Sequence, residues 1–337
     1  MRCEDAMVNE SAVARARSGD GTAFAQLTQP FRRELLLHCY RMLGSVQDAE
    51  DLLQETLVAA WRGLDRFEER SGLRTWLYRI ATNRCLNALR ARDRRPDMYT
   101  PEVALPEPTR VVDPLWLEPF PDVLLSRLPE SAPGPEAALE QRESLRLAFM
   151  VAVHNLPPRQ RAVLVLRDVL GFRTAEVARM LDTTEDAVGS ALKRARATLA
   201  AQPPDNAPAA GSAAERAVVD AFADAFQDGD VPRIVALLTD DAWLTMPPLP
   251  LEYQGREQVA QFLVRIPFRG TRSYRLVPTR ANTQPAFGAY LRDAHTPIWH
   301  AHGLVVLTLT GTEISAVTRF MDTGVLPHFG LPRILRD

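Results

Sequence analysis

The chain has 337 residues, 46% of them hydrophobic and 24% charged, and a net charge of −2 at pH 7. This length exceeds one typical domain, and the composition is that of a globular protein rather than a disordered one. No stretch approaches the roughly 20 apolar residues of a membrane helix, and no signal-peptide pattern opens the chain, so we expect no membrane partner. The three cysteines form no CxxC pair, so we expect a reducing, cytoplasmic setting without a disulfide or metal site.

Residues 11–95 are predicted to be helical and carry 15 arginines against 10 acidic residues. Within them, the apolar spacing of residues 49–61 predicts an amphipathic helix over 48–61, with Ser45 as its N-cap. The second face of this helix is acidic and polar, and comprises Asp48, Glu50, Asp51, Gln54 and Glu55. Such a face could meet a basic partner, although charged helix faces are often simply solvated.

The next predicted helix, 73–92, combines arginine and asparagine side chains with aromatic residues. Phe67 and Trp76 flank a polar loop, and a stripe follows along the helix that comprises Arg74, Trp76, Arg79, Asn83, Asn87 and Arg90. Arginines that follow the backbone, beside aromatic pockets for unstacked bases, are typical of single-stranded DNA binding. The alternative for Trp76 is that it is a core residue.

Two segments are predicted to be linkers. Residues 96–134 contain nine prolines and carry 7 acidic residues against 2 arginines, which predicts an extended acidic linker without regular elements. Residues 201–212 form a second, short linker rich in alanine and proline.

Residues 135–200 are predicted to form a helical unit that ends in a helix-turn-helix. A short helix at 174–181, a break at Asp182 and Thr183, and a helix at 185–199 have the spacing of an angled helix pair. The last helix is expected to turn one face to a core, and that face comprises Val188, Ala191, Leu192, Ala195 and Leu199. Its other face carries Ser190, Lys193, Arg194 and Arg196. Short polar and basic residues on one helix face suit the major groove of DNA. An ordinary helical hairpin with a solvated basic face is the alternative.

Two strings of residues carry a family resemblance. DAEDLLQET at 48–56, with RTWLYRIATN at 74–83, resembles region 2 of extracytoplasmic-function (ECF) sigma factors, and LPPRQRAVLVLR at 156–167, with VGSALKRAR at 188–196, resembles their region 4. The resemblance implies that the acidic face of 48–61 binds core RNA polymerase at the β′ clamp, and that the 73–92 stripe reads the −10 element. It further implies that region 4 meets the β flap and reads the −35 element, and that the linker threads the nucleic-acid channel of the polymerase.

From residue 213 onward, helices alternate with strand-like runs, which predicts an α+β domain with an antiparallel sheet. Residues 213–337 resemble SnoaL-like domains of the cone fold, as in the SigJ-type subgroup of ECF sigma factors. The resemblance suggests a small-molecule ligand in a pocket whose candidate residues are Trp243, Tyr253, His300, His302 and Arg319. His300 and His302 share one strand face, so both could line it.

The sequence therefore predicts a multidomain protein with two all-α helical domains and a C-terminal α+β cone. The predicted function is promoter-specific transcription initiation, with the C-terminal domain regulating it in cis and with no cofactor or metal. The alternative is an enzyme, a SnoaL-type cyclase or isomerase that carries a helical DNA-binding regulator. Fold resemblance alone does not decide between these two.

Overall fold

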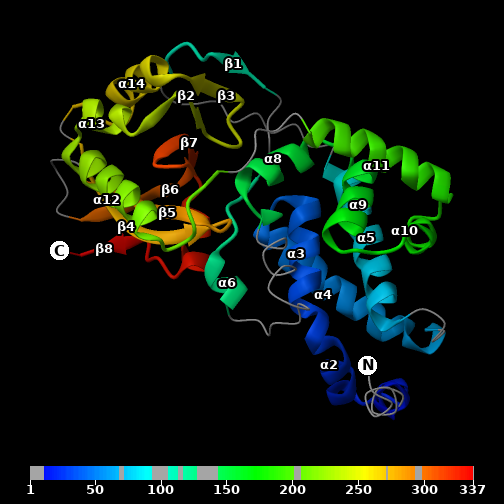
Figure 1. The fold of residues 1–337 in the computed structure, drawn as a ribbon. Coiled ribbons are helices and arrows are strands. Elements are labelled where there is room, and N and C mark those ends of the chain that lie inside the picture. The colour runs from blue at the N-terminus through cyan, green and yellow to red at the C-terminus, as the bar shows by residue number, and fades with distance from the viewer. Residues whose placement is uncertain are drawn as a thin grey trace. The chain divides into compact units, whose positions relative to one another are not determined.

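A computed structural model describes residues 11–67, 72–92, 105–112, 117–126, 143–200, 206–270, 272–292 and 298–336. The chain forms two compact units, each with its own elements (Figure 1). Unit 1 comprises residues 1–96, 125–144 and 149–202, and unit 2 comprises residues 97–124, 145–148 and 203–337.

The described part of the first ninety residues of unit 1 is helical. Its helices are α2 (Gly21–Thr28), α3 (Arg32–Leu43), α4 (Val46–Gly63) and α5 (Leu73–Arg92). The side chain of Ser45 accepts a hydrogen bond from the Asp48 amide, which caps α4 as predicted. Helices α3, α4 and α5 pack on one another around fully buried side chains such as Leu35, Tyr40 and Leu77.

The second part of unit 1 is also helical and contains α9 (Pro158–Leu164), a π-helical turn (Val165–Val169), α10 (Thr174–Met180) and α11 (Glu185–Leu199). Helix α8 (Leu147–His154) precedes them. The predicted helix pair is confirmed: α10 ends before Asp182, whose positive φ of 48° lets the chain turn, and Thr184 caps α11 by accepting from the Ala187 amide.

Arg161 joins the two parts of unit 1. Its buried guanidinium donates to the Met42 carbonyl at the end of α3 and to the His154 carbonyl, the latter at 2.8 Å. Burial lowers its pKa to about 10, so Arg161 stays charged at neutral pH and holds these carbonyls with charge-assisted hydrogen bonds.

Unit 2 is an α+β domain in which helices cover one face of a curved sheet (Figure 1). The helices are α12 (Ala213–Asp228), α13 (Val231–Ala236) and α14 (Arg256–Arg265). The main strands are β2 (Leu238–Thr245), β3 (Leu251–Gln254), β4 (Ser273–Ala281), β5 (Gln284–Arg292), β6 (Trp299–Thr310) and β7 (Glu313–Phe320), and β8 (Ile334–Leu335) pairs with β6. A core that includes Phe222, Leu244 and Leu307 lies between helices and sheet.

The strand order is β1-β3-β2-β7-β6-β5-β4, and the sheet is not wholly antiparallel as predicted. Strand β2 pairs with β7 in parallel. After β3 the chain crosses to β4 at the other edge of the sheet and returns through β5 and β6 to β7, which lies beside β2. The other strand pairs in the sheet are antiparallel.

Described parts of the predicted linker belong to unit 2. Strand β1 (Arg110–Val111) extends the sheet beside β3, and a short helix, α6 (Asp122–Ser126), follows. The prediction that prolines exclude regular elements from 96–134 is therefore wrong at these two places. An edge strand tolerates prolines, because the amides on its outer side need no partner in the sheet. The linker residues 96–104, 113–116 and 127–134 lie outside the described part of the chain.

Candidate nucleic-acid interface

The acidic face predicted on α4 is solvent-accessible. Asp51, Gln54 and Glu55 are exposed, and Asp48 and Glu50 are half-buried. One member is already paired within the unit, since Glu55 accepts an ion pair from Arg84 of α5 at 2.6 Å. The opposite side of the helix buries Ala49, Leu57 and Ala60, so the face is presented by the ordinary amphipathic packing of α4.

Helix α5 presents the predicted arginine and asparagine stripe. Arg79, Asn83, Asn87 and Arg90 are at least partly exposed at intervals of three or four residues, so they share one side of the helix. Arg90 donates to the Asn87 amide oxygen at 3.1 Å. Trp76 is half-buried with its ring 5.0 Å from that of Phe67, so its burial is compatible with both interpretations of Trp76. The polar loop residues 68–71 lie outside the described part of the chain.

Two of the predicted −10 residues contact the second half of unit 1. The Arg74 guanidinium lies 4.5 Å from the ring centre of Phe172, and the Asn83 side chain donates to the Met180 carbonyl at 3.3 Å. The rings of Tyr78 and Phe172 meet edge to face at 5.1 Å. Part of the expected single-strand surface is therefore occupied by the segment around α10 in this arrangement of unit 1.

A partly buried polar network includes Arg74 of the stripe, and the sequence patterns did not predict it. Glu34 of α3 accepts from Arg74 at 3.1 Å and from the Tyr78 hydroxyl at 3.2 Å. Burial, and then the Glu34 carboxylate, raises the pKa of Tyr78, so the phenol stays protonated and can donate. This network fixes the position of the Arg74 guanidinium at the surface of unit 1. The only sequence signal for it is an acidic residue in the largely apolar run at 34–43.

The same region holds a neutral buried histidine. His38 Nε2 lies 2.9 Å from the Thr82 hydroxyl, which itself donates to the Tyr78 carbonyl at 2.7 Å. Because the Thr82 hydroxyl already donates its proton to the Tyr78 carbonyl, Nε2 of His38 is the donor to Thr82. Burial, with the nearby Arg41 and Arg74 charges, lowers the pKa of His38 to about 3.

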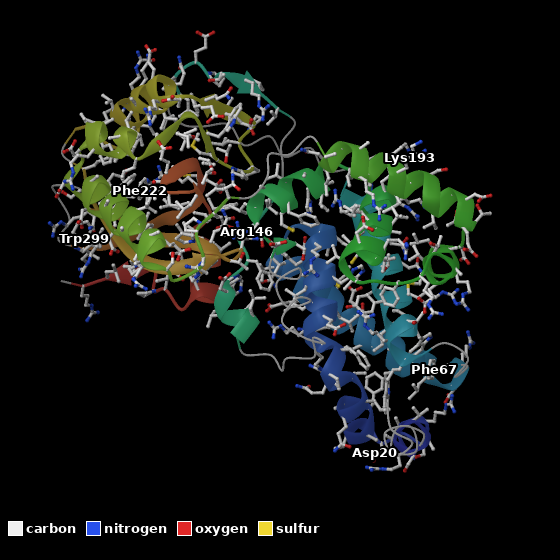
Figure 2. All side chains as sticks on the ribbon, viewed as in Figure 1. Asp20, Phe67, Arg146, Lys193, Phe222 and Trp299 are labelled. Atoms are coloured by element: carbon white, nitrogen blue, oxygen red, sulfur yellow. The ribbon has the colours of Figure 1, made fainter. Side chains whose placement is uncertain are left out.

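Helix α11 exposes the basic residues predicted to read DNA. Ser190, Lys193, Arg194 and Arg196 are all exposed, and Lys193 stands on the outer side of the helix (Figure 2). Arg196 forms a two-point ion pair with Asp168, with both distances 2.8 Å, and this raises the pKa of Arg196. Lys193 and Arg194 have no ion pair with any residue that the structure describes, so they are the more available cations.

The five candidate pocket residues of unit 2 fall in different environments. Trp243 lies on the face of β2 opposite Leu244 and stacks under Arg110 at 4.3 Å. Tyr253 is fully buried against Phe262 and donates to the Pro106 carbonyl. His300 is exposed, whereas His302 and Arg319 approach one another, with Nη2 of Arg319 3.5 Å from the His302 carbonyl.

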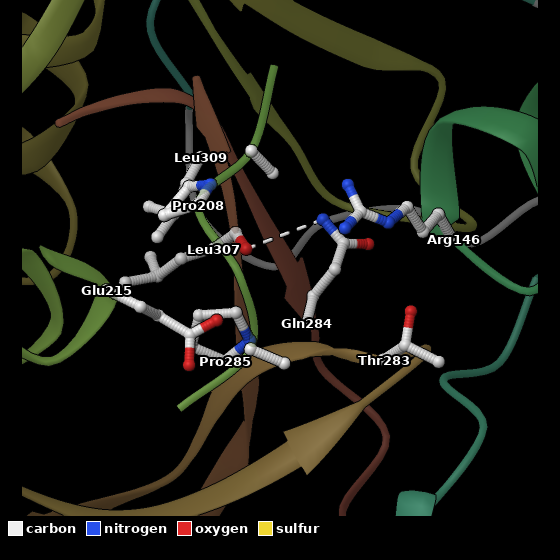
Figure 3. A pocket seen from close by; sticks show the side chains of 10 residues that line it. Arg146, Pro208, Glu215, Thr283, Gln284, Pro285, Leu307 and Leu309 are labelled. Carbon is white, nitrogen blue, oxygen red and sulfur yellow. Dashed lines mark hydrogen bonds between the residues drawn. The ribbon is translucent and has the colours of Figure 1, made fainter. Parts of the chain in front are cut away.

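A small pocket elsewhere in unit 2 is too small for a ligand. It lies among Arg146, Pro208, Glu215, Thr283 and Gln284, and Gln284 donates across it to the Leu307 carbonyl (Figure 3). The free space of about 10 Å³ accommodates one water molecule.

Metal-ligating clusters and membrane helices are both absent from the described residues. No three His, Cys, Asp or Glu side chains among them lie close enough together to hold a metal ion. None of the helices in the described ranges is long and apolar enough to cross a membrane.

Comparison with known proteins places both helical parts in one family. Residues 27–95 match Sigma-70 region 2, and residues 146–199 match Sigma-70, region 4. The ECF RNA polymerase sigma factor SigG of Mycobacterium tuberculosis (strain ATCC 25618 / H37Rv) is 42% identical over 329 residues, which cover 94% of this chain and 85% of SigG. SigJ of the same strain is 32% identical over 248 residues, which cover 70% of each protein.

The fold is shared as well. The crystal structure of the M. tuberculosis ECF sigma factor SigJ matches with a TM-score of 0.62 at 22% identity, and the match covers 92% of this chain and 99% of that one. The helical parts are thus sigma regions 2 and 4, and the match to SigJ also extends over the α+β fold of unit 2. Because SigG is 42% identical to this chain over 94% of its residues, the chain belongs to the extracytoplasmic-function family of RNA polymerase sigma factors.

Proposed function

We propose that this sigma factor binds the β′ clamp of core polymerase through the acidic face of α4 and the β flap through region 4. It reads the −10 element with the stripe of α5 and the −35 element with α11. The observation that carries this assignment is the presence of both sigma regions in one unit, with Arg79, Asn87 and Arg90 of α5 and the basic face of α11 exposed. Its place of action is that of core polymerase, the cytoplasm.

Run-off transcription with purified core polymerase tests this proposal. The chain should yield specific transcripts from a library of promoters of its own genome, and charge reversal of Asp51 and Glu55 should reduce co-purification with the polymerase. Charge reversal of Asp220 and Asp224, on α12 of unit 2, is the matched control. A chain that neither binds core polymerase nor gives any specific transcript would contradict the proposal.

We further propose that the C-terminal domain regulates the sigma unit in cis by holding the linker. One docking point is strand β3, with which β1 of the linker pairs. The Thr109 amide donates to the Glu252 carbonyl at 2.9 Å and the Val112 amide to the Pro250 carbonyl at 2.8 Å. Arg110 pairs with the Glu252 carboxylate and covers the Trp243 ring. Leu105 also packs on the domain core, so this end is held by backbone, charge and apolar contacts together.

The second docking point is the turn between β4 and β5. The Phe120 amide donates to the Asn282 side-chain oxygen at 2.8 Å, and the main-chain amide of Asn282 donates to the Phe120 carbonyl at 2.8 Å. Asp122 accepts from the Thr283 amide at 2.8 Å. The Phe120 ring is fully buried, so release of this end exposes a large apolar side chain to water.

The two docking points support regulation because they compete with the role of a sigma linker. A segment hydrogen-bonded to β3 and to the β4–β5 turn cannot simultaneously lie extended in the nucleic-acid channel of the polymerase. Engagement of polymerase must therefore release the linker, and anything that stabilises the docked form opposes that step.

Deletion of the chain from Gly211 onward tests cis regulation. Full-length and truncated proteins should differ several-fold in run-off transcription from the same promoter. The contacts above favour higher activity for the truncated form, provided that it still binds core polymerase. Equal activity over a range of concentrations would leave the C-terminal domain without a regulatory role.

The alternative of a C-terminal enzyme receives less support from the placement of acid–base groups. Asp240 is largely exposed and paired with Arg256 at 2.8 Å, and Asp241 and His300 are also exposed. Neither of these carboxylates approaches His302 among the described contacts. We therefore propose a regulatory, noncatalytic role for this domain.

A further inference from the structure

A cluster of positive and polar groups lies inside the sheet of unit 2. Arg319 of β7 is cross-strand partner to Val305, a core residue, so its side chain points to the helix-covered face. Tyr274 of β4 and His302 of β6 lie beside it, with ring centres 6.0 Å apart, and Arg272 precedes β4. These four residues are called the anion cluster below.

The charge in the anion cluster is not balanced. Arg319 is only 7% exposed, and no carboxylate among the residues that the structure describes pairs with it. Its polar neighbours are the His302 carbonyl at 3.5 Å and the Tyr274 phenol. Buried arginines are normally paired, because an isolated buried charge opposes folding.

The neighbouring groups add to this imbalance. Burial, and then the charges of Arg319 and Arg272, lowers the pKa of His302 to about 4. The Tyr274 hydroxyl is buried and has no well-formed hydrogen bond within the described residues. A buried phenol, a neutral imidazole and a guanidinium therefore converge with no anion to receive their protons.

The surroundings of the anion cluster combine access with an apolar wall. His302 and Arg272 are half-buried, so the cluster reaches solvent on their side. On another side the rings of Phe226 and Phe268 pack edge to face on Tyr274 at 5.3 and 5.9 Å. A ligand that fits both features carries a negative group and an apolar or aromatic body.

We propose that the anion cluster binds a small organic carboxylate with an apolar ring. Its carboxylate accepts from the Arg319 guanidinium and the Tyr274 hydroxyl, and its ring lies against Phe226 and Phe268. The proposal names the ligand class of the C-terminal domain. The use of such a ligand as a signal rests on the proposed regulatory function, but its binding requires neither polymerase nor promoter.

The test compares an acid with its neutral amide on the full-length protein. We expect 1-naphthoate to raise the unfolding temperature of the protein, measured by differential scanning calorimetry, and to bind in isothermal titration calorimetry. Neither 1-naphthamide nor inorganic phosphate should do so. Arg319→Met should weaken naphthoate binding at least about tenfold, as expected when one charge-assisted hydrogen bond is removed. Arg275→Gln, which replaces an exposed arginine on the same strand as Tyr274, should bind as the wild type does.

A second measurement needs no ligand and separates a binding role from a structural one. Because its buried charge is uncompensated, Arg319→Met should unfold at the same temperature as the wild type or higher. Tyr274→Phe keeps the ring and should fold normally while naphthoate affinity falls. Calorimetry near pH 5 should show proton uptake, because a bound carboxylate raises the pKa of His302 against Arg319 and Arg272.

Three outcomes would overturn the proposal: equal effects of the acid and the amide, no acid-specific shift at ligand concentrations up to about 10 mM, or marked destabilisation by Arg319→Met. Run-off transcription is measured separately on the same variants. Absence of naphthoate binding with intact promoter-specific transcription would therefore reject the ligand site without touching the sigma function.

Discussion

Replacement of Asn282 by glycine isolates the contact between the linker and the C-terminal domain. Asn282 has a φ of +53°, which glycine adopts without strain, so Asn282→Gly removes the side chain and leaves the turn intact. It deletes the acceptor for the Phe120 amide at 2.8 Å and the donor to the Leu145 carbonyl at 2.6 Å. Both partners lose a hydrogen bond in a site from which water is excluded.

The expected magnitude follows from these two bonds. Each buried group left without its partner costs about 1–3 kcal/mol, so the docked form should be destabilised by about 2–6 kcal/mol relative to the released form. Amide hydrogen exchange at Phe120 should then accelerate by at least about 30-fold, at 1.4 kcal/mol for each factor of ten. Asn282→Asp tolerates the same φ and keeps the acceptor for Phe120, so it should show a smaller effect.

The assay is hydrogen exchange followed by mass spectrometry, with the amide of Val112 at the β3 docking point as an internal comparison. Transcription by Asn282→Gly should move in the same direction as the truncation from Gly211. Wild-type exchange at Phe120 in a folded Asn282→Gly protein would refute the reasoning that this side chain holds the linker.

Three other predictions concern unit 1. Replacing Lys193 and Arg194 by alanine should weaken promoter binding and reduce its salt dependence by up to about 0.9 log unit for each phosphate that is no longer neutralised. Arg196→Ala should have a smaller effect, because the Arg196 side chain is bound to Asp168. Unchanged salt slopes in anisotropy titrations would show that α11 does not contact the promoter. Phe172→Ala uncovers Arg74 and should tighten binding of a single-stranded −10 oligonucleotide several-fold, about 1 kcal/mol, in fluorescence anisotropy. Unaltered affinity in a folded variant would show that Phe172 does not block a DNA-binding surface at Arg74. The pKa of His38 is about 3 in the folded state and about 6.5 when unfolded, so the unfolded chain binds the extra proton and stability falls as pH drops from 6.5 toward 3. In urea unfolding, the wild type should lose about 3 kcal/mol more stability than His38→Gln between pH 7 and pH 4. Equal losses in the two proteins would show that His38 does not titrate in this way.

Local patterns predicted the exposed basic face of α11 well. The spacing of Val188, Leu192 and Ala195 determines which side of α11 is buried, and Lys193 and Arg194 are exposed as a direct consequence. A period of 3.6 residues is a property of a single segment, so a single sequence carries it. The roles of these residues at the polymerase and the promoter stay predictions.

Pairings between distant segments were not accessible in the same way. Arg196 was predicted to face DNA, but nothing near it in sequence indicates its pairing with Asp168, 28 residues away. The parallel pairing of β2 with β7 and the burial of Phe120 depend on segments far apart in the chain. The acidic, proline-rich composition of the linker gives no indication of its docking partner, because that partner lies more than a hundred residues further along the chain.

The two sides of the linker contact are made at different times during synthesis. Asp122 precedes its partner Thr283 by 161 residues. At about 5–20 residues per second, a ribosome needs about 8–32 s to make that stretch, and the rest of the sigma core emerges within it. Each newly made molecule thus passes through a period in which both promoter-reading parts exist and the linker has nothing to dock on. A polymerase that captures the nascent chain in that interval meets it before the C-terminal domain has folded.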